Sequence, residues 1–171
     1  LFSKNVTLSN DGSVFSLNDS NNNTTFDFIN CTIAQNTSYN VLKLDRAPSR
    51  NIINAIIWDN QISSNPLNIN GSYNFIYNNI QQTHVGVGNI SLDPRFIDPD
   101  NGDYALQPTS PSIDSGHPDL DGEGETWETD TDDQDPDGTR MDMGSSWFSQ
   151  IESEPPTIQI TNIDDDTKFG S

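Results

Sequence analysis

Several residue types are scarce in this chain of 171 residues, and each shortage excludes a class of protein. Only 7 lysines and arginines oppose 26 aspartates and glutamates, a net charge of −19, so the chain lacks the basic surface that nucleic acid or an anionic membrane requires. The single cysteine excludes a disulfide within the chain. No apolar run approaches the ~18 residues of a membrane span, which argues against direct membrane insertion. Four alanines against 17 isoleucines and 21 asparagines disfavour helices and favour strands and tight turns.

Apolar and acidic residues are unevenly distributed along the chain. Residues 1–97 hold 30 of the 39 Leu, Ile, Val and Phe residues, whereas residues 98–150 hold four. Residues 93–142 carry 16 acidic and 2 basic side chains, a net charge of −14. A hydrophobic core is therefore expected in the first part only. The first residue is Leu rather than Met, and we expect the chain to be an interior part of a longer polypeptide.

Four asparagines mark an internal repeat. They are Asn5, Asn30, Asn54 and Asn78, and the spacings between them are 25, 24 and 24 residues. An apolar segment precedes three of them, and a second apolar segment follows at an offset of roughly nine to sixteen residues. Each unit therefore holds about three short strands separated by polar turns.

A period in the low twenties with three strands per unit predicts an all-β fold, a right-handed parallel β-helix whose coils occupy residues 1–82. The asparagines are expected to stack in one column at a bend between strands. One apolar column would contain Leu8, Ile33 and Ile57, and the polar Gln81 at the next position places the end of regular stacking near residue 80. An antiparallel β-sandwich with similarly spaced turns is the alternative.

A series of segments in the C-terminal half follows a characteristic order. These are Asn54-Ala-Ile-Ile-Trp-Asp-Asn60, Gly88-Asn-Ile-Ser-Leu-Asp-Pro-Arg-Phe-Ile-Asp-Pro99, Gly102-Asp-Tyr-Ala-Leu-Gln-Pro108, Ser110-Pro-Ser-Ile-Asp-Ser-Gly116, Asp137-Gly-Thr-Arg140 and Asp142-Met-Gly144. Their order resembles the C-terminal coils and cap of bacterial pectate-lyase-like repeat surface proteins of the "choice-of-anchor" type, which are right-handed parallel β-helices. The resemblance implies an extracellular or outer cell-surface location.

Residues 83–150 are expected to form an irregular C-terminal cap. The open end of a β-helix exposes strand edges and core, which must be covered. Apolar residues separated by Pro and Gly turns suit a loop laid over the last coil; they are Phe96, Ile97, Tyr104, Leu106 and Ile113. A substrate groove formed by Tyr104 and Trp58 is the less favoured interpretation.

The acidic part of this cap predicts a calcium site. Asp133, Asp135 and Asp137, followed by Gly138, match the front half of a calcium loop with oxygen ligands at alternate positions. Gly144 stands where an EF-hand has its bidentate Glu, so a later ligand must come from elsewhere, with Asp142 the nearest. Asp119 and Asp121 form a further candidate group. A solvated acidic loop without metal is the alternative.

No catalytic residues are predicted. The coils offer one compact mixed cluster, formed by Asp45, Arg46 and Arg50, which is more typical of a surface ion pair than of acid–base catalysis. His84 and His117 lie in or near turns without a partner at metal-ligand spacing, and we expect both to face solvent.

Two classes of function remain. The first is a non-catalytic β-helix module of a large secreted or cell-surface bacterial protein, structural, adhesive or glycan-contacting, and stabilised by Ca²⁺. The second is the C-terminal end of a β-helix polysaccharide lyase or glycoside hydrolase whose catalytic coils lie upstream. Expected partners are polysaccharide or other cell-surface components and further domains of the same polypeptide. Residues 151–171 read as a Pro-containing linker and the first strand of an immunoglobulin-like β-sandwich.

Overall fold

The structure is all-β. This computed structural model describes residues 2–3, 13–18, 25–45, 49–62, 67–70, 73–82 and 84–150. Within these ranges the chain forms short strands and two single-turn 3-10 helices, η1 (Pro99–Asn101) and η2 (Thr131–Asp133). No helix in this part of the chain is long and apolar enough to cross a membrane. The linker and strand predicted for 151–171 lie outside the described residues.

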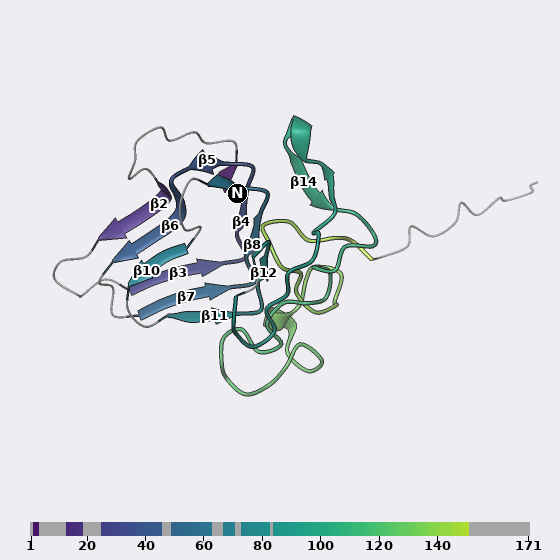
Figure 1. Ribbon diagram of the computed structural model, residues 1–171. Coiled ribbons are helices and arrows are strands. Elements are labelled where there is room, and N and C mark those ends of the chain that lie inside the picture. Colours follow the sequence, from purple (N-terminus) through teal and green to yellow (C-terminus); the bar gives the residue numbers. More distant parts are fainter. Residues whose placement is uncertain are drawn as a thin grey trace, which may run out of the picture.

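Three short parallel sheets form the first part of the molecule (Figure 1). The β8 sheet contains β1 (Phe2–Ser3), β4 (Thr32–Ala34), β8 (Ile56–Trp58) and β12 (Asn79–Ile80). The β6 sheet contains β2 (Ser13–Asn18), β6 (Asn40–Asp45) and β10 (Leu67–Asn70). The β7 sheet contains β3 (Thr25–Ile29), β7 (Ser49–Ile53) and β11 (Asn74–Ile76), and β5 (Thr37–Ser38) pairs with β9 (Gln61–Ile62).

The chain passes through the β6, β7 and β8 sheets in that order three times, and each passage is one repeat: β2–β4, β6–β8 and β10–β12. Successive repeats pair in parallel, with Ile29 opposite Ile53 and Ile33 opposite Ile57, a shift of 24 residues. The parallel pairing of these segments excludes the antiparallel sandwich for them. Asn30 and Asn54 turn the chain between the β7 and β8 sheets in the left-handed conformation, at φ 51° and 55°.

The predicted asparagine column is wrong at its fourth member. Ile53 pairs with Ile76, so Tyr77 rather than Asn78 occupies the turn position that follows, at φ 54°. The third repeat is thus one residue shorter at this corner, and Ile80 pairs with Ile57 where the sequence spacing had placed Gln81.

The first member of that column is affected too. Strand β1 pairs Phe2 with Ile33, a shift of 31 residues, whereas the alignment of Asn5 with Asn30 needs a shift of 25. Asn5 itself lies outside the described residues.

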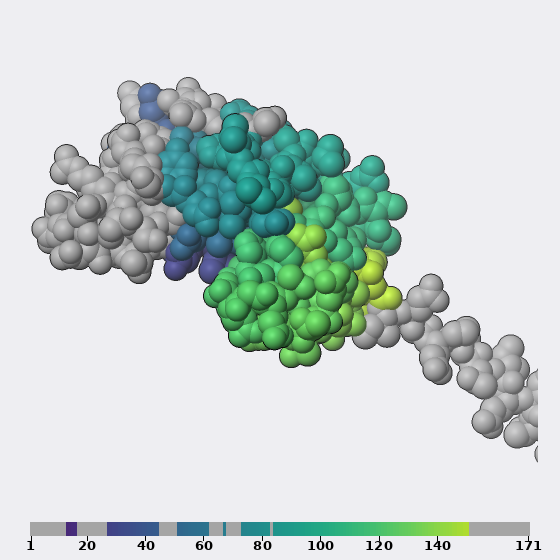
Figure 2. All heavy atoms as spheres, turned by 90° about the horizontal axis from the view of Figure 1, so that it is seen from below, coloured from purple at the N-terminus to yellow at the C-terminus, as the bar shows by residue number. Residues whose placement is uncertain are grey.

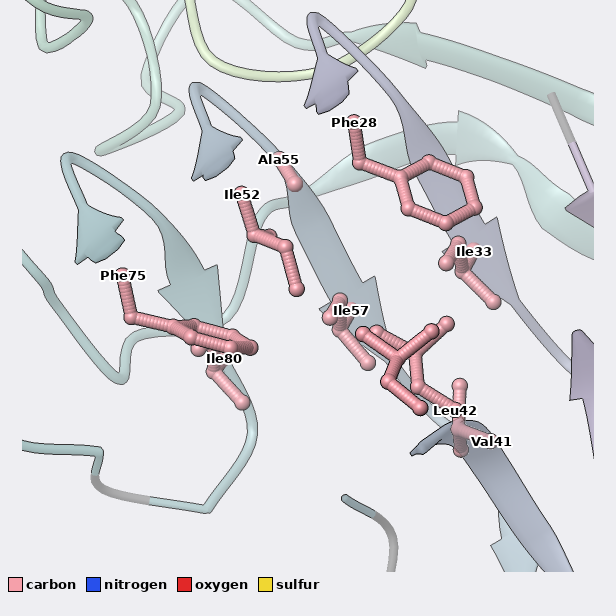
Figure 3. Packing of buried hydrophobic residues seen from close by; sticks show 10 residues of the cluster. Phe28, Ile33, Val41, Leu42, Ile52, Ala55, Ile57, Phe75 and Ile80 are labelled. Carbon is pink, nitrogen blue, oxygen red and sulfur yellow. The ribbon is translucent and has the colours of Figure 1, made fainter. Parts of the chain in front are cut away.

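Side chains from the β6, β7 and β8 sheets point toward one another and form an inner core (Figure 3). Ile33, Ile57 and Ile80 line one wall, with exposed fractions of 1–3%. Burying each such side chain stabilises the fold by about 1.5–3 kcal/mol relative to leaving it in water. The remaining buried members are Phe28, Val41, Leu42, Leu44, Ile52, Ala55 and Phe75.

Asn78 joins two repeats through its side chain. Its Oδ1 accepts the N–H of Ala55 at 2.8 Å, and its Nδ2 donates to Ile52 O at 2.7 Å and Ile76 O at 3.0 Å. Asn89 repeats the pattern one level further along, because its Oδ1 accepts the N–H of Asn78 at 2.9 Å. Buried backbone groups at the corner are thereby satisfied where the sheet ladders leave them unpaired.

The β8 sheet continues beyond β12 through residue 90. Ile90 forms a parallel bridge with Asn79, and the N–H of Ile90 donates to Asn78 O at 2.8 Å. Gly86 allows the short return of the chain, because a Cβ there would lie 1.9 Å from Phe75 O.

The C-terminal segment packs on the outer face of the β8 sheet, not only over the last repeat as the sequence predicted. Ala34, Ile56 and Trp58 point away from the inner core and form a second cluster with the antiparallel hairpin of β13 (Phe96–Asp98) and β14 (Asp103–Leu106) and with Met143. Figure 1 places β4, β8 and β12 between the other parallel strands and this segment, and Figure 2 shows its acidic part as a green lobe beside the repeats.

Hydrogen bonds attach this segment to all three repeats. The N–H of Ser145 donates to Thr32 Oγ1 at 3.0 Å, and the N–H of Gly144 donates to Asn54 O at 2.6 Å. Asn79 Nδ2 donates to Ser112 Oγ at 3.0 Å. The cover lies here because a strand that is apolar on both faces must be buried on both.

Candidate metal centre

The loop from Asp119 to Gly124 folds around one carboxylate. Asp119 Oδ1 accepts the N–H of Gly122 at 2.8 Å, and Asp119 Oδ2 accepts the N–H of Gly124 at 3.1 Å. Both glycines have left-handed φ values, 79° and 95°, which a residue without Cβ adopts at no steric cost. Asp121 Oδ1 accepts the N–H of Glu123 at 3.1 Å in the same manner. Local turn chemistry therefore orients both aspartates.

Asp133 approaches this loop from η2. Its side chain is buried, with 1% of its surface exposed, and its Oδ1 accepts the N–H of Leu120 at 2.5 Å. Its Oδ2 is also buried but has no hydrogen-bond partner. A buried carboxylate oxygen without a partner is costly, because desolvation penalises the charge and nothing compensates it.

Two overlapping groups of carboxylates converge at this point. One oxygen each from Asp119, Asp121 and Asp133 lie within 4.8 Å of one another, and the same holds for Asp121, Asp130 and Asp132. We refer to these five residues as the acidic cluster. Either group can hold a metal ion. Oxygen-only donors suit a hard cation such as Ca²⁺ or Mg²⁺.

Negative charge in the acidic cluster is not balanced by basic side chains. Among the described residues, none of its five carboxylates forms an ion pair with Lys, Arg or His. A hydrogen bond with Asp130, together with the charges of Asp121 and Asp130, raises the pKa of exposed Glu123 to about 7. A hydrogen bond with Asp130 also raises the pKa of Asp132. Both shifts report repulsion that a bound cation would relieve.

The three alternate aspartates predicted to share one ion do not converge in the structure. Only Asp133 joins the acidic cluster. Asp135 N donates to Thr139 O at 2.9 Å in a tight turn that contains Gly138 at φ 85°. Asp137 accepts from Thr139 N and Oγ1 through one oxygen and from Gln150 N through the other. These hydrogen bonds outweigh desolvation and lower the pKa of Asp137.

Asp135 and Asp142 form a separate carboxylate pair. The N–H of Asp142 donates to Asp135 Oδ2 at 2.9 Å, while the buried Asp142 side chain accepts from Asp114 N at 2.8 Å and Phe148 N at 2.7 Å. Burial, followed by the charge of Asp142, raises the pKa of Asp135 to about 7. Burial likewise raises the pKa of Asp142. The pair connects segments of the cover and lies apart from the acidic cluster's two groups.

The sequence prediction therefore identified Asp119, Asp121 and Asp133 correctly as neighbours and missed Asp130 and Asp132. A signal for the missing pair exists in Asp130-Thr-Asp-Asp133, because an aspartate before a short helical turn caps it. Asp130 indeed accepts the N–H of Asp132 at 3.2 Å, at the start of η2. The alternate-aspartate pattern drew attention away from this helical turn.

The two histidines are half-buried, which corrects the prediction that they face solvent. The ring of His84 lies 4.5 Å from that of Phe75, and burial lowers the pKa of His84. The ring of His117 packs edge-on against Tyr77 at 4.7 Å, and its Nδ1 accepts the N–H of Asp119 at 3.1 Å. Both cover aromatic rings at the edge of the repeats. The cluster of Asp45, Arg46 and Arg50 involves side chains outside the described residues.

Comparison with known proteins adds no relative: no protein-family model, no curated protein and no solved structure matches this chain.

Proposed function

We propose that this chain is a non-catalytic, calcium-stabilised module of a large secreted or cell-surface bacterial protein. In this proposal residues 1–82 are the last coils of a right-handed parallel β-helix, residues 83–150 cover them, and residues 151–171 lead into an immunoglobulin-like domain. The module serves a structural or adhesive role and contacts glycans.

The order of the strands supports the β-helix. Three successive repeats visit the β6, β7 and β8 sheets in one order and pair in parallel throughout. Parallel strands joined by a crossover are right-handed in about 98% of cases, which supports the proposed hand. The cyclic order of sheets around a shared inner core is the arrangement expected of stacked coils.

The buried Asp133 is the observation that carries the calcium proposal. Its unpartnered Oδ2 lies in a residue that shares its site with Asp119 and Asp121, and a divalent cation bound there would supply the missing partner. The carboxylates of Asp119 and Asp121 also accept backbone N–H groups, which suits a structural site better than proton transfer.

A calcium site of this kind supports an extracellular location. Calcium modules that work outside cells bind at about 10⁻⁴–10⁻³ M, and only millimolar calcium fills them. The site offers three carboxylates in its first group, and exposed Asp121 leaves it open to exchange with solvent.

Thermal unfolding of the metal-free chain in CaCl₂ and in NaCl at matched ionic strength tests the calcium proposal. Calcium should raise the Tm well beyond NaCl, because binding to the folded state adds about 2.7 kcal/mol at a hundredfold excess over Kd. Asp133→Asn should abolish the difference, while exposed Asp98→Asn should retain it. Asp121→Asn, whose exposed side chain is dispensable for folding, should weaken calcium affinity about tenfold by calorimetry. Equal Tm shifts with both salts would show screening alone and refute the proposal.

A further inference from the structure

A groove separates the repeats from the β13–β14 hairpin. It is a cavity of about 510 Å³, partly open to solvent, that lies against the outer end of β8 and the turns around Arg95. This volume is within the roughly 300–1,000 Å³ of small-molecule sites. Its polar and aromatic side chains are Gln35, Trp58, Asp59, Asp93, Arg95 and Gln107, and we call it the Trp58 groove.

Trp58 supplies the apolar surface of the groove. The side chain is half-buried and packs on the second cluster, so that part of a large indole remains accessible in the cavity. Within the part of the chain that the structure describes, the indole N–H has no hydrogen-bond partner. A partly exposed indole offers a flat apolar surface with one polar contact point.

Polar side chains on one side of the groove are held in place from below. Gln35 Oε1 accepts the hydroxyl of buried Tyr104 at 3.1 Å, and Gln35 Nε2 lies 3.4 Å from Asp59 Oδ2 and 3.3 Å from Asp100 Oδ1. Tyr104 therefore positions Gln35 and does not face a ligand itself, which corrects the interpretation that Tyr104 lines a groove with Trp58. Asp59 is exposed and offers a carboxylate to the cavity.

The opposite side carries a fixed cation. Arg95 adopts the left-handed conformation at φ 54°, and its N–H donates to Asp93 Oδ1 at 2.9 Å. Its Nη1 donates to Thr109 O at 3.1 Å, and its carbonyl accepts Gln107 N at 2.9 Å. One guanidinium N–H is thus used to orient the group, and further donors remain for a ligand.

We propose that the Trp58 groove binds a sugar residue of a neutral polysaccharide. A sugar ring presents a flat apolar face for the indole, and its hydroxyls both donate to Asp59 and accept from Arg95 and Gln35. Two carboxylates and the net charge of −19 disfavour a polyanion, and the guanidinium of Arg95 disfavours a cation. Pre-positioned polar groups reduce the ordering cost of binding. This inference rests on the proposed glycan-contacting role and names its site and its ligand class.

Neutral gluco-, manno- and galacto-oligosaccharides test the groove in the full 171-residue chain, with trigalacturonate and tetralysine as charged comparisons. We expect saturable binding of at least one neutral oligosaccharide, followed by calorimetry and by shifts in the amide resonances of Trp58 and Arg95. Trp58→Leu and Arg95→Gln should each lower that affinity about tenfold, the effect of losing one good contact. Exposed Trp147→Leu and Glu128→Gln should not change it.

Several outcomes would overturn the inference: no neutral oligosaccharide binds, tetralysine or trigalacturonate binds instead, or Trp58→Leu and Arg95→Gln leave affinity unchanged. Arg95→Gln alters an exposed side chain, so it keeps the test decisive if Trp58→Leu fails to fold. The calcium response is measured on the same samples. A retained calcium response without sugar binding would refute the groove alone, whereas sugar binding without a calcium response would refute the calcium proposal alone.

Discussion

Asn78 Oδ1 accepts the backbone N–H of Ala55 at 2.8 Å, one repeat away. Asn60 makes the same contact with Asn36, whose N–H donates to Asn60 Oδ1 at 3.0 Å. In both cases the Nδ2 of the later asparagine donates to a carbonyl three residues before the accepted N–H, Ile52 O or Ile33 O. Side-chain amides thus continue the hydrogen bonding between repeats where the strands end.

Asn78→Ala should destabilise the fold by about 1–3 kcal/mol. The substitution removes a buried amide and leaves the N–H of Ala55 and the carbonyl of Ile52 without partners. Urea unfolding followed by circular dichroism measures the change. Asn74→Ala, at an exposed position on β11, should cost much less. Equal losses for the two variants would show that the contact contributes nothing specific.

Asp137→Asn should leave the calcium response intact. The carboxylate of Asp137 caps Thr139 and Gln150 and is absent from the groups that can hold a metal, although its spacing in the sequence resembles a ligand. Differential scanning fluorimetry with and without about 5 mM calcium, well above the Kd of extracellular sites, checks this. Loss of the calcium shift in this variant would restore the alternate-aspartate loop as the binding site.

The Asp135–Asp142 pair should make stability depend on pH in a defined direction. Burial raises the pKa of Asp135 to about 7 and also raises that of Asp142, so the folded state holds a proton that the unfolded chain releases. The resulting stability is complete below about pH 4, the ordinary pKa of aspartate, and is lost as the pH rises through about 7.

Asp135→Asn should therefore raise the Tm at pH 8 and flatten the decline between pH 4 and pH 8. The new amide can still accept from Asp142 N and can donate to the Asp142 carboxylate. The gain should be only a few degrees, since Asp135 is half-buried and solvent screens the repulsion. Thermal melts in EDTA compare this variant with exposed Asp98→Asn. A parallel pH profile for the two variants would contradict the assignment.

Gly144→Ala should detach the C-terminal segment from the β8 sheet. The residue has φ 102°, and an added Cβ would lie 2.8 Å from Ile56 Cδ1 and 2.9 Å from Thr32 Oγ1. Gly102→Ala is the matched control, because its φ is 89° and its added Cβ meets nothing within 4 Å. Both changes should cost about 1–3 kcal/mol for backbone strain, and Gly144→Ala about 1–3 kcal/mol more for the contact. Near-ultraviolet circular dichroism and Tm report the difference.

The sequence predicted the parallel pairing of the first repeats because apolar strands recur at a spacing of 24 residues. It could not predict the register at Tyr77, since one residue lost at a corner changes no composition and Asn78 remains a plausible turn residue. The position of the cover was readable in principle. Ala55, Ile56, Ile57 and Trp58 are apolar without alternation, which indicates a strand buried on both faces.

The acidic cluster was only partly predictable for a different reason. Asp119 and Asp133 are brought together by Leu120 N and by the turn at Gly122, contacts that no spacing rule encodes. The groove beside Trp58 depends on the hairpin of β13 and β14 returning to β8, which is a tertiary contact.

The hydrogen bond from Ser145 N to Thr32 Oγ1 joins residues 113 positions apart, and it sets how the molecule responds to force. A pull on the chain beyond Gln150 reaches β4 and β8 through Ser145 and Gly144, before it can peel β12 from the end of the stack. Several contacts are then loaded together in shear rather than broken one after another. Stacked repeats that would otherwise fray singly should therefore rupture in one step.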